Sequence, residues 1–512
     1  MKRLAAALAT SLALTSFAAR PRAQQPPAAL TGAFAEVDRL LTQFIADRHV
    51  PGAAWGVIVD GQLSHVTTRG LRDVAAKRPV DADTVFRIAS MTKSFTTISI
   101  LKLRDEGKLA LDDPAEKYVP EMAGLQYPST DAPKITIRHL LSHAEGFPED
   151  NPWGDRQLAD TEQQLSDMLR GGIPFSNAPG LVYEYSNLGF AILGRVVTNV
   201  SKVPYPQYVA ANILKPLGMT STTLEPSEVA PGRLAHGYRW EDERWKDEPL
   251  LANGSFGSMG GMLTSVRDLT RYVGVFLSAW PPRDGAELPP LKRSSLREMQ
   301  HLWSPVPSLV TRNAAGALQL TSGGYGYGLR VAQTCALKTI VSHTGGLPGF
   351  GSIMAWLPDY GVGIVAFGNL TYTGWTAAAT GALEALVAKG ELKPRQPKPS
   401  PALTETRDKV AKLVTAWDDR LADSIAAENL FLDTSKERRR VEIERLRSTV
   451  GACTPGSGFD TVENALRGSW TVNCERGKLE VSITLAPTMP PTVQFLNVRT
   501  ASAAPPRTES CP

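Results

Sequence analysis

The sequence predicts an α/β (α+β) fold: an antiparallel sheet flanked by helices, with a mostly helical insertion, followed by a small C-terminal all-β module. Three observations predict this architecture. Strand-like segments lie near both ends of residues 30–390, a helix-rich stretch separates them, and a proline-rich segment at 391–403 precedes a tail of short alternating strands. Strands that flank a long insertion from both sides are typical of one layered domain built from distant parts of the chain.

The length of 512 residues suits two or three domains, and 42% hydrophobic residues support a large buried core. The expected segments, in chain order, are a signal peptide at 1–23, a sheet-and-helix domain at 30–390, a linker at 391–403, a helical connector at 404–448 and a β-rich accessory module at 449–512. We expect a stiff linker because it contains four prolines, namely Pro394, Pro397, Pro399 and Pro401.

The strands of the first domain are expected where apolar residues alternate or run together between turn residues. These segments are 54–60, 63–68, 325–331, 339–342, 351–356 and 362–367. The turn Asp60-Gly61 joins the first two as a β-hairpin. A segment with a proline and a glycine, 357–361, joins the last two.

Helices are expected where apolar residues recur at a spacing of three to four. In the first domain they are 91–103, 186–200, 205–214 and 376–388, with a loop-rich, mostly helical stretch over 111–277. Beyond the linker, helical patterns cover 405–427 and 435–447. The charged run at 436–440 is more typical of a solvated helix face than of a binding patch.

Ser90-Met91-Thr92-Lys93 places a serine and a lysine three residues apart at the start of a predicted helix. Residues i and i+3 share a helix face, so the Lys93 ammonium can lie beside the Ser90 hydroxyl. The positive end of the helix favours the negative charge that develops during a reaction there. Because a free serine is a weak nucleophile and a positioned amine activates it, the pattern predicts an acylation site.

Tyr185-Ser186-Asn187 is the second polar motif, and it opens a predicted helix. A phenol held beside an ammonium loses its proton more easily and can serve as a base. Asn187, two residues further on, can orient the lysine or bind a substrate amide. Both side chains therefore suit a site built around Ser90 and Lys93.

His343-Thr344-Gly345-Gly346 is the third motif, and it follows a predicted strand. A polar residue followed by two glycines on an edge strand lets a substrate backbone approach closely. A backbone N–H in this motif can pair with the N–H of Ser90 to form an oxyanion hole.

Together the three motifs resemble those of the class C β-lactamase-like serine hydrolases, which include class C β-lactamases, D-alanyl-D-alanine carboxypeptidases, D-aminopeptidases and family VIII esterases. The residues that carry the resemblance are Ser90, Lys93, Tyr185, Asn187, His343, Thr344 and Gly345. Supporting segments lie at 111–114, 135–143 and 259–263, and the resemblance covers about 34–389. It implies a β-lactamase/transpeptidase-like fold for the domain at 30–390.

The resemblance also assigns roles. It implies that Ser90 is the acylated nucleophile, Lys93 its activating partner and Tyr185 the proton shuttle. The N–H groups of Ser90 and Gly346 would form the oxyanion hole, and Asn187, His343 and Thr344 would contact the substrate. The implied activity is that of an exported serine hydrolase that forms an acyl-enzyme on esters or on small amides and peptides.

His343 bears on the substrate class. The β-lactamases usually carry lysine at this position, where it attracts the substrate carboxylate, whereas a histidine is mostly neutral at pH 7. We therefore expect an esterase or a peptidase rather than a β-lactamase, with short-chain esters hydrolysed faster than penicillins. A β-lactamase or D-alanyl-D-alanine carboxypeptidase is the alternative on this fold. A non-catalytic binding or scaffold protein is the alternative of another class.

Other catalytic schemes lack their motifs. No serine stands in Gly-x-Ser-x-Gly, and His139 and His143 are not part of His-Glu-x-x-His, so we expect them to pack in a helix and a loop. The sequence also has no paired-cysteine metal spacing, no Walker loop and no dinucleotide fingerprint. We expect no metal and no cofactor.

The net charge of +4 is mild, and the predicted leader holds four of the basic residues. This balance argues against a nucleic-acid partner. Lys2 and Arg3 precede an apolar run at 4–14, which predicts a secretory signal and a periplasmic or secreted protein. No other apolar run is long enough for a stable membrane span. The expected partner is a small ester or peptide-like molecule, and the partner of the C-terminal module is unknown.

Four cysteines occur, Cys335, Cys453, Cys474 and Cys511. An exported chain meets an oxidising compartment, which favours disulfides. Cys453 and Cys474 flank strand-like segments of one small region and can pair, and Cys511 is an alternative partner.

Overall fold

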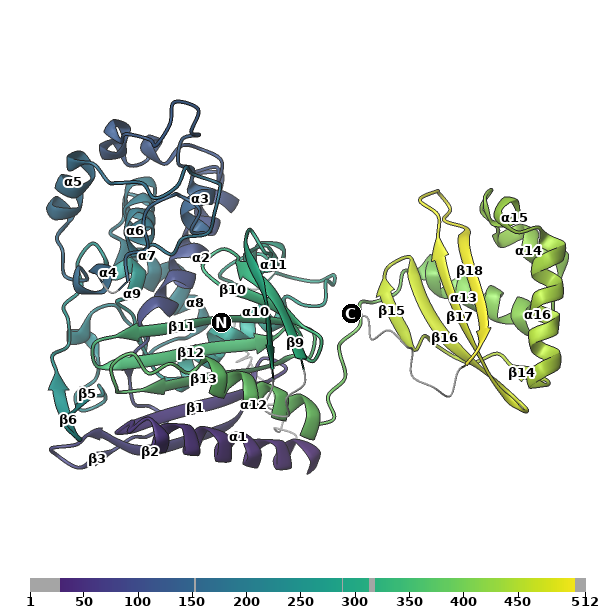
Figure 1. The fold of residues 1–512 in the computed structure, drawn as a ribbon, viewed down its shortest axis with the longest axis horizontal. Helices are drawn as coiled ribbons and strands as arrows, with labels where there is room; N and C mark the ends of the chain where they lie inside the picture. The colour runs from purple at the N-terminus through teal and green to yellow at the C-terminus, as the bar shows by residue number, and fades with distance from the viewer. Residues whose placement is uncertain (1–27, 152, 288, 313–317, 502–512) are drawn as a thin grey trace, which may run out of the picture.

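The computed structural model describes residues 28–151, 153–287, 289–312 and 318–501. The predicted leader at 1–23 and Cys511 lie outside the described residues. Figure 1 shows a large body built on one sheet, joined by an extended segment to a smaller C-terminal body with its own sheet. The predicted fold class is confirmed by this combination of antiparallel sheet, flanking helices, helical insertion and separate C-terminal β-sheet.

Within the described residues, a nine-stranded antiparallel sheet forms the centre of the large body. Its strands, in spatial order, are β3 (Arg78–Pro79), β2 (Gln62–Asp73), β1 (Gly52–Val59), β13 (Val362–Gly368), β12 (Phe350–Leu357), β11 (Lys338–Leu347), β10 (Arg330–Thr334), β9 (Leu318–Tyr325) and β8 (Ser304–Arg312). β1 pairs with β13, with Trp55 opposite Ala366. The first and last strands along the body are therefore neighbours inside the sheet.

Helices cover both faces of this sheet. α1 (Ala28–Asp47) and α12 (Thr376–Lys389) lie side by side on one face (Figure 1), where they pack on the apolar residues of β1 and β13. α2 (Thr92–Asp105), α10 (Val266–Ser278) and α11 (Arg293–Met299) lie on the other side. β12 and β13 are buried along their whole length, and this double cover explains their continuous apolar sequence.

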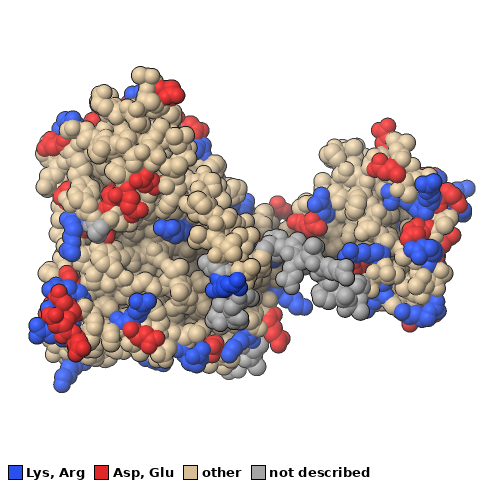
Figure 2. Space-filling view, viewed as in Figure 1, with Lys and Arg blue, Asp and Glu red and all other residues tan. Residues whose placement is uncertain are grey.

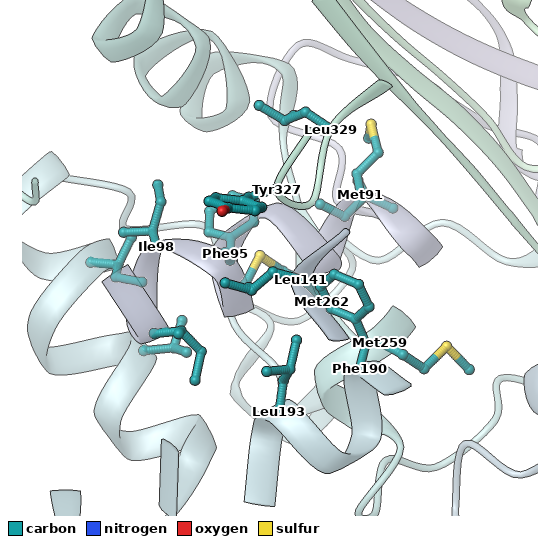
Figure 3. Close-up of a cluster of buried hydrophobic side chains, with 14 of the residues drawn as sticks. Met91, Phe95, Ile98, Leu141, Phe190, Leu193, Met259, Met262, Tyr327 and Leu329 are labelled. Carbon is teal, nitrogen blue, oxygen red and sulfur yellow. The ribbon is translucent and has the colours of Figure 1, made fainter. Parts of the chain in front are cut away.

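A mostly helical region follows α2 in the chain. Its helices are α3 (Ile137–Leu141), α4 (Trp153–Arg156), α5 (Glu162–Gly171), α6 (Asn187–Ser201), α7 (Tyr205–Val209), α8 (Lys215–Leu217) and α9 (Gly257–Gly260). Two small ladders accompany it, β4 (Phe86–Arg87) with β7 (Leu263–Thr264) and β5 (Gly237–Glu241) with β6 (Arg244–Glu248). Figure 3 shows Phe95 and Ile98 of α2 amid side chains from this region, so α2 is enclosed in the core.

The predicted strand at 325–331 is wrong. Tyr325 ends β9 and Arg330 begins β10, and the residues between them form a turn. Gly328 has a φ of +65°, and a Cβ there would lie 2.3 Å from Oγ1 of Thr97 in α2. The turn is therefore pressed against α2. The sequence does not predict β8, because Pro305 and Pro307 interrupt its strand pattern.

The smaller body begins with four helices, α13 (Pro401–Thr415), α14 (Asp419–Ile425), α15 (Leu430–Asp433) and α16 (Lys436–Val450). Its antiparallel strands are β14 (Cys453–Thr454), β15 (Thr461–Asn464), β16 (Arg467–Cys474), β17 (Gly477–Leu485) and β18 (Val493–Thr500). The single helical stretch predicted at 405–427 is two helices, because Asp418 caps a new one by accepting from the N–H of Leu421.

The cysteine pairing that spacing suggested is present. Cys453 and Cys474 lie opposite each other on β14 and β16 and form a disulfide. No cysteine in the described part of the chain is free.

Consecutive residues of the linker are anchored to different bodies. Arg395 donates to the carbonyl oxygen of Trp280 in the large body at 2.8 Å. Gln396 donates to the carbonyl oxygen of Asp460 at 2.7 Å and accepts from the N–H of Val462 at 2.8 Å in the small body. Side-chain contacts therefore hold the linker to both bodies.

The surface carries both signs of charge. Figure 2 shows acidic and basic side chains interspersed over the described part of this face, without one large area of either sign. Among the described residues, no helix has the length and apolar character needed to cross a membrane.

Candidate active site

Ser90 and Lys93 form a buried pair. Ser90 lies in a short 3₁₀ turn (Ala89–Met91) that runs directly into α2. Ala89 has a φ of +47°, a left-handed conformation that is costly for a residue with a Cβ and that occurs at functional sites. Nζ of Lys93 lies 3.1 Å from Oγ of Ser90. The structure therefore brings the two residues together as their spacing predicts.

Two further oxygens accept hydrogen bonds from Nζ of Lys93. They are Oδ1 of Asn187 at 2.6 Å and the carbonyl oxygen of Met259 at 3.0 Å. Burial lowers the pKa of Lys93 to about 7, although the negative charges of Asp155 and Asp150 act to raise it. A substantial fraction of the amine is therefore neutral near pH 7, which suits a base for a hydroxyl.

Asp150 holds the N-terminus of α6, the helix that carries Asn187. Its carboxylate accepts hydrogen bonds from the N–H groups of Asn187 at 2.7 Å and Leu188 at 2.8 Å, two donors that have no partner within the helix. Nδ2 of Asn187 donates to Oδ1 of Asn151 at 2.6 Å. This bond fixes the amide so that its oxygen faces Lys93.

Tyr185 lies beside the lysine, with its ring centre 4.8 Å from Nζ of Lys93, and is 6% exposed. Burial raises the pKa of Tyr185 well above its usual value, although a hydrogen bond with Ser90 acts to lower it. Desolvation therefore keeps the phenol of Tyr185 protonated, which differs from the base that the motif predicts. A neutral phenol in this place is a proton donor.

His139 and His143 pack as predicted in a helix and a loop. Nδ1 of His139 accepts from the N–H of Thr136 at 3.2 Å and completes a capping box at the start of α3. Nδ1 of His143 accepts from the N–H of Ser186 at 3.1 Å, and its ring centre lies 4.3 Å from that of Tyr185. Burial lowers the pKa of His143 well below its usual value, so it is neutral.

His343 lies in β11 and is 1% exposed. Its Nδ1 is 2.6 Å from the carbonyl oxygen of Thr344, which can only accept, so Nδ1 carries the proton. Nε2, at 2.8 Å from Oη of Tyr325, then accepts from that phenol. Burial lowers the pKa of His343 to about 3. The imidazole is thus neutral and both nitrogens have partners, so it offers no positive charge to a substrate.

A pocket of about 400 Å³ collects these groups. Its lining residues are Ser90, Asn151, Asp155, Tyr185, Arg330, His343, Thr344, Gly346 and Tyr372. Lys93 and Asn187 are fully buried behind this lining. All seven residues proposed from the sequence therefore belong to one site, five on the pocket wall and two behind it.

Gly345 brings β11 against the segment that leads into Ser90. A Cβ on Gly345 would lie 2.0 Å from the carbonyl oxygen of Ile88, so only glycine fits. Oγ of Ser352 donates to the same carbonyl oxygen at 2.9 Å. This close approach places Gly346 and Ser90 on one wall of the pocket, where two backbone N–H groups can serve one oxyanion.

Arg330 supplies the cation that His343 lacks. It opens β10, is exposed and lines the pocket, and its guanidinium carbon lies 6.0 Å from the ring centre of Tyr183. A positive charge therefore lies on the pocket wall although His343 is neutral, and the expected preference for esters over penicillins stays a prediction. Arg330 follows the Gly326-Tyr327-Gly328 loop, whose composition indicates a structural turn and gives no sign of the arginine's role.

Sequence reasoning also missed Asn151, Asp155 and Tyr372 on the pocket wall. Asn151 and Asp155 lie in a polar stretch after Pro148 that fits no motif, and Tyr372 lies in the loop after β13.

Among the described residues, no group of three or more histidine, cysteine, aspartate or glutamate side chains is placed to hold a metal ion.

The chain is similar to known proteins in sequence and in fold. The family model described as Beta-lactamase matches residues 37–389. Protein flp of Staphylococcus aureus (strain N315) is 29% identical over 341 residues, which span 65% of this chain but only 63% of flp. A protein named Beta-lactamase from Lysobacter lactamgenus is 29% identical over 386 residues, 72% of this chain and 94% of that protein.

Two solved structures share the fold. The octameric penicillin-binding protein homologue from Pyrococcus abyssi is 22% identical, with a TM-score of 0.58, and the match covers 92% of this chain and 94% of that one. A class C beta-lactamase is 20% identical, with a TM-score of 0.55, over 70% of this chain and 96% of its own. At these identities the likeness shows the fold alone.

Proposed function

This chain belongs to the beta-lactamase family, and on that premise we propose that it hydrolyses small esters or amides through an acyl-enzyme on Ser90. The contact of Oγ of Ser90 with Nζ of the fully buried Lys93, at 3.1 Å, is the observation that carries the proposal. It pairs a nucleophile with an amine whose pKa burial has lowered to about 7.

Acylation follows from the protonation states. Neutral Lys93 takes the proton of Ser90 Oγ while the oxygen attacks the substrate carbonyl carbon, and the N–H groups of Ser90 and Gly346 bind the resulting oxyanion. Tyr185, a neutral phenol, gives its proton to the leaving oxygen or nitrogen as that bond to carbon breaks. The proton on Lys93 then returns to the Tyr185 phenolate, so both groups regain their starting states.

Deacylation runs through Lys93 and Ser90. A water molecule enters where the leaving group departed and gives a proton to neutral Lys93 as its oxygen attacks the acyl carbon. The bond from the carbon to Ser90 Oγ breaks, and Oγ recovers a proton from the lysine. The acid is released, and the enzyme is ready for another cycle.

Arg330 favours substrates that carry a carboxylate. It stands on the same pocket wall as His343, and a guanidinium binds carboxylates through charge-assisted hydrogen bonds. A peptide with a free C-terminal carboxylate or a β-lactam would gain from this contact. We therefore propose carboxylate-bearing esters and amides as the preferred substrates. This keeps a D-alanyl-D-alanine carboxypeptidase or a β-lactamase as the second candidate, which the name of the Lysobacter relative also supports.

A serine-reactive fluorophosphonate tests the proposal. Intact-mass spectrometry should show one adduct on the wild type and none on Ser90→Ala, and turnover of p-nitrophenyl esters, nitrocefin and D-alanyl peptides should fall by up to about a millionfold. Ser99→Ala is the matched control, because Ser99 lies in the same helix and its hydroxyl donates only within that helix, to the carbonyl oxygen of Phe95. Labelling of Ser90→Ala at the wild-type rate would contradict the assignment.

A further inference from the structure

A hydrogen bond crosses the pocket from its sheet side to its helical side. Tyr372 lies in the loop after β13, and its Oη donates to Oδ2 of Asp155 in α4 at 3.1 Å. Both residues line the pocket that contains Ser90. They are 217 positions apart in the chain, so this bond joins the two parts of the body between which the pocket lies.

Tyr372 is held in a costly backbone conformation. Its φ is +50°, in the left-handed region that aromatic residues rarely adopt. Fixed neighbours impose it: the N–H of Tyr372 donates to the carbonyl oxygen of Phe350 at 3.2 Å, and that of Thr371 to the carbonyl oxygen of Tyr238 at 2.8 Å. An observed backbone outlier at the rim of an active site is a reason to look for a role of its side chain.

The ring of Tyr372 covers Gly346. A Cβ on Gly346 would lie 2.9 Å from Cδ1 of Tyr372, so the ring rests directly on the glycine. Gly346 pairs with Gly351 of β12, where a Cβ would lie 2.5 Å from the backbone nitrogen of Thr373. The loop around Tyr372 thus presses on both glycines of this pair. One of them carries the N–H assigned above to the oxyanion hole.

Asp155 secures the other end of the bond. It is 3% exposed, and within the described residues its Oδ1 has no hydrogen-bond partner. A buried carboxylate oxygen without a partner is costly, which is a reason to seek a function for it. The groups whose charge or hydrogen bond acts on Asp155 are Lys93, Tyr372, Asp150 and Arg156.

We propose that Tyr372 and Asp155 are positioning residues of the hydrolase: the Tyr372 ring holds the Gly346 backbone for the oxyanion, and Asp155 anchors the ring from the opposite wall while its negative charge acts on Lys93. The inference rests on the proposed function, because it takes Ser90 as nucleophile and Gly346 as part of the oxyanion hole. It adds two residues, neither of which forms a hydrogen bond with Ser90.

The electrostatic part has a definite sign. Asp155 and Asp150 both act to raise the pKa of Lys93, and the neutral His143 and His343 contribute no charge of their own. Removing the charge of Asp155 leaves Asp150 alone to oppose desolvation. Lys93 would then lose its proton at a lower pH. The acid limb of the pH–rate profile would therefore also move to lower pH.

Two conservative variants separate the parts. Tyr372→Phe keeps the ring and deletes only the bond to Asp155, and Asp155→Asn keeps an acceptor for the phenol and deletes the charge. Tyr360→Phe, in the turn between β12 and β13, is the matched control. We would measure kcat and KM for p-nitrophenyl butyrate from pH 5 to pH 9, counting active sites by fluorophosphonate titration.

For Tyr372→Phe we expect kcat to fall about tenfold with little change in KM, somewhat less than the loss of an oxyanion-hole donor itself. For Asp155→Asn we expect the acid limb of kcat to move to lower pH. The double variant should fall short of the product of the two single effects, because the residues share one bond. Tyr360→Phe should match the wild type.

Wild-type kcat in Tyr372→Phe together with an unmoved acid limb in Asp155→Asn would overturn the positioning roles. A lowered melting temperature with unchanged kcat per active site would do the same, because it would show a purely structural bond. If the wild type itself takes up no phosphonate on Ser90, the proposed function fails and this inference falls with it. A labelled wild type with unaffected variants overturns the inference alone.

Discussion

Replacing Arg330 with glutamine should abolish a preference for carboxylate-bearing substrates. Arg330 is the cation on the pocket wall, because His343 is neutral and Lys93 lies behind the lining. Glutamine keeps a similar length and polarity but removes the charge. The change should therefore act on charged substrates and leave neutral ones nearly unaffected.

The exposure of Arg330 sets the magnitude. A fully exposed ion pair contributes at most about 1 kcal/mol, whereas a hydrogen bond to a charged group in a closed site contributes about 1.5–3 kcal/mol. Arg330 is exposed in the free enzyme but lies on a concave wall that a substrate would cover. We therefore expect Arg330 to contribute an interaction free energy between these two ranges, about 1.4 kcal/mol, which is a tenfold change in kcat/KM.

The assay compares matched esters. Phenyl acetate and 3-carboxyphenyl acetate place the carboxylate on the leaving group, and p-nitrophenyl butyrate and the p-nitrophenyl monoester of glutaric acid place it on the acyl group. In the wild type the charged member of at least one pair should be favoured, and Arg330→Gln should reduce that ratio about tenfold. Arg330→Lys, which keeps the charge, is the control.

The ionic strength gives a second test of the role of Arg330. The preference should weaken between low and high ionic strength, because the guanidinium is open to solvent before the substrate binds. If Arg330→Gln slows both members of a pair equally, Arg330 supports the fold of the pocket and does not bind the carboxylate. A wild type that shows no preference in either pair would refute the reasoning about charge altogether.

Three further outcomes are expected. The kcat/KM should rise with pH through about 7, because only the neutral amine of Lys93 can accept the serine proton and its pKa is lowered to about 7; a profile flat from pH 5 to pH 9 would contradict this. Lys93→Ala and Tyr185→Phe should each cost at least about a hundredfold on esters with poor leaving groups, and an unchanged kcat for Tyr185→Phe on such esters would remove its role as proton donor. The double variant Cys453→Ser, Cys474→Ser should lower the stability of the smaller body by about 3 kcal/mol. Thermal unfolding measures this loss, and the esterase activity per active site should stay constant.

The nucleophile and its lysine could be predicted from the sequence because their contact is local. An i, i+3 spacing at the start of a helix is enough to place Ser90 beside Lys93. The strands that carry long apolar runs, such as β12 and β13, could be predicted for the same reason. β8 could not, because its prolines hide a strand that the edge of the sheet tolerates.

The remaining parts of the site depend on contacts between distant segments. Arg330 begins β10, Asp155 lies in α4 and Tyr372 lies in the loop after β13, so they reach one pocket only when these distant segments come together. The proton affinity of Tyr185 could not be predicted either. The burial that keeps this phenol protonated belongs to the whole fold and cannot be predicted from a motif.

The anchoring of Arg395 decides where the catalytic body can be cut. Composition places the end of that body near the last residue of α12, Lys389, just before the prolines. A chain shortened there would lose the guanidinium that caps the carbonyl oxygen of Trp280 and pairs with Asp60 at 3.3 Å. A cut between Arg395 and Gln396 would instead leave each body with its own anchor, so a stable fragment should retain Arg395 as its final side chain.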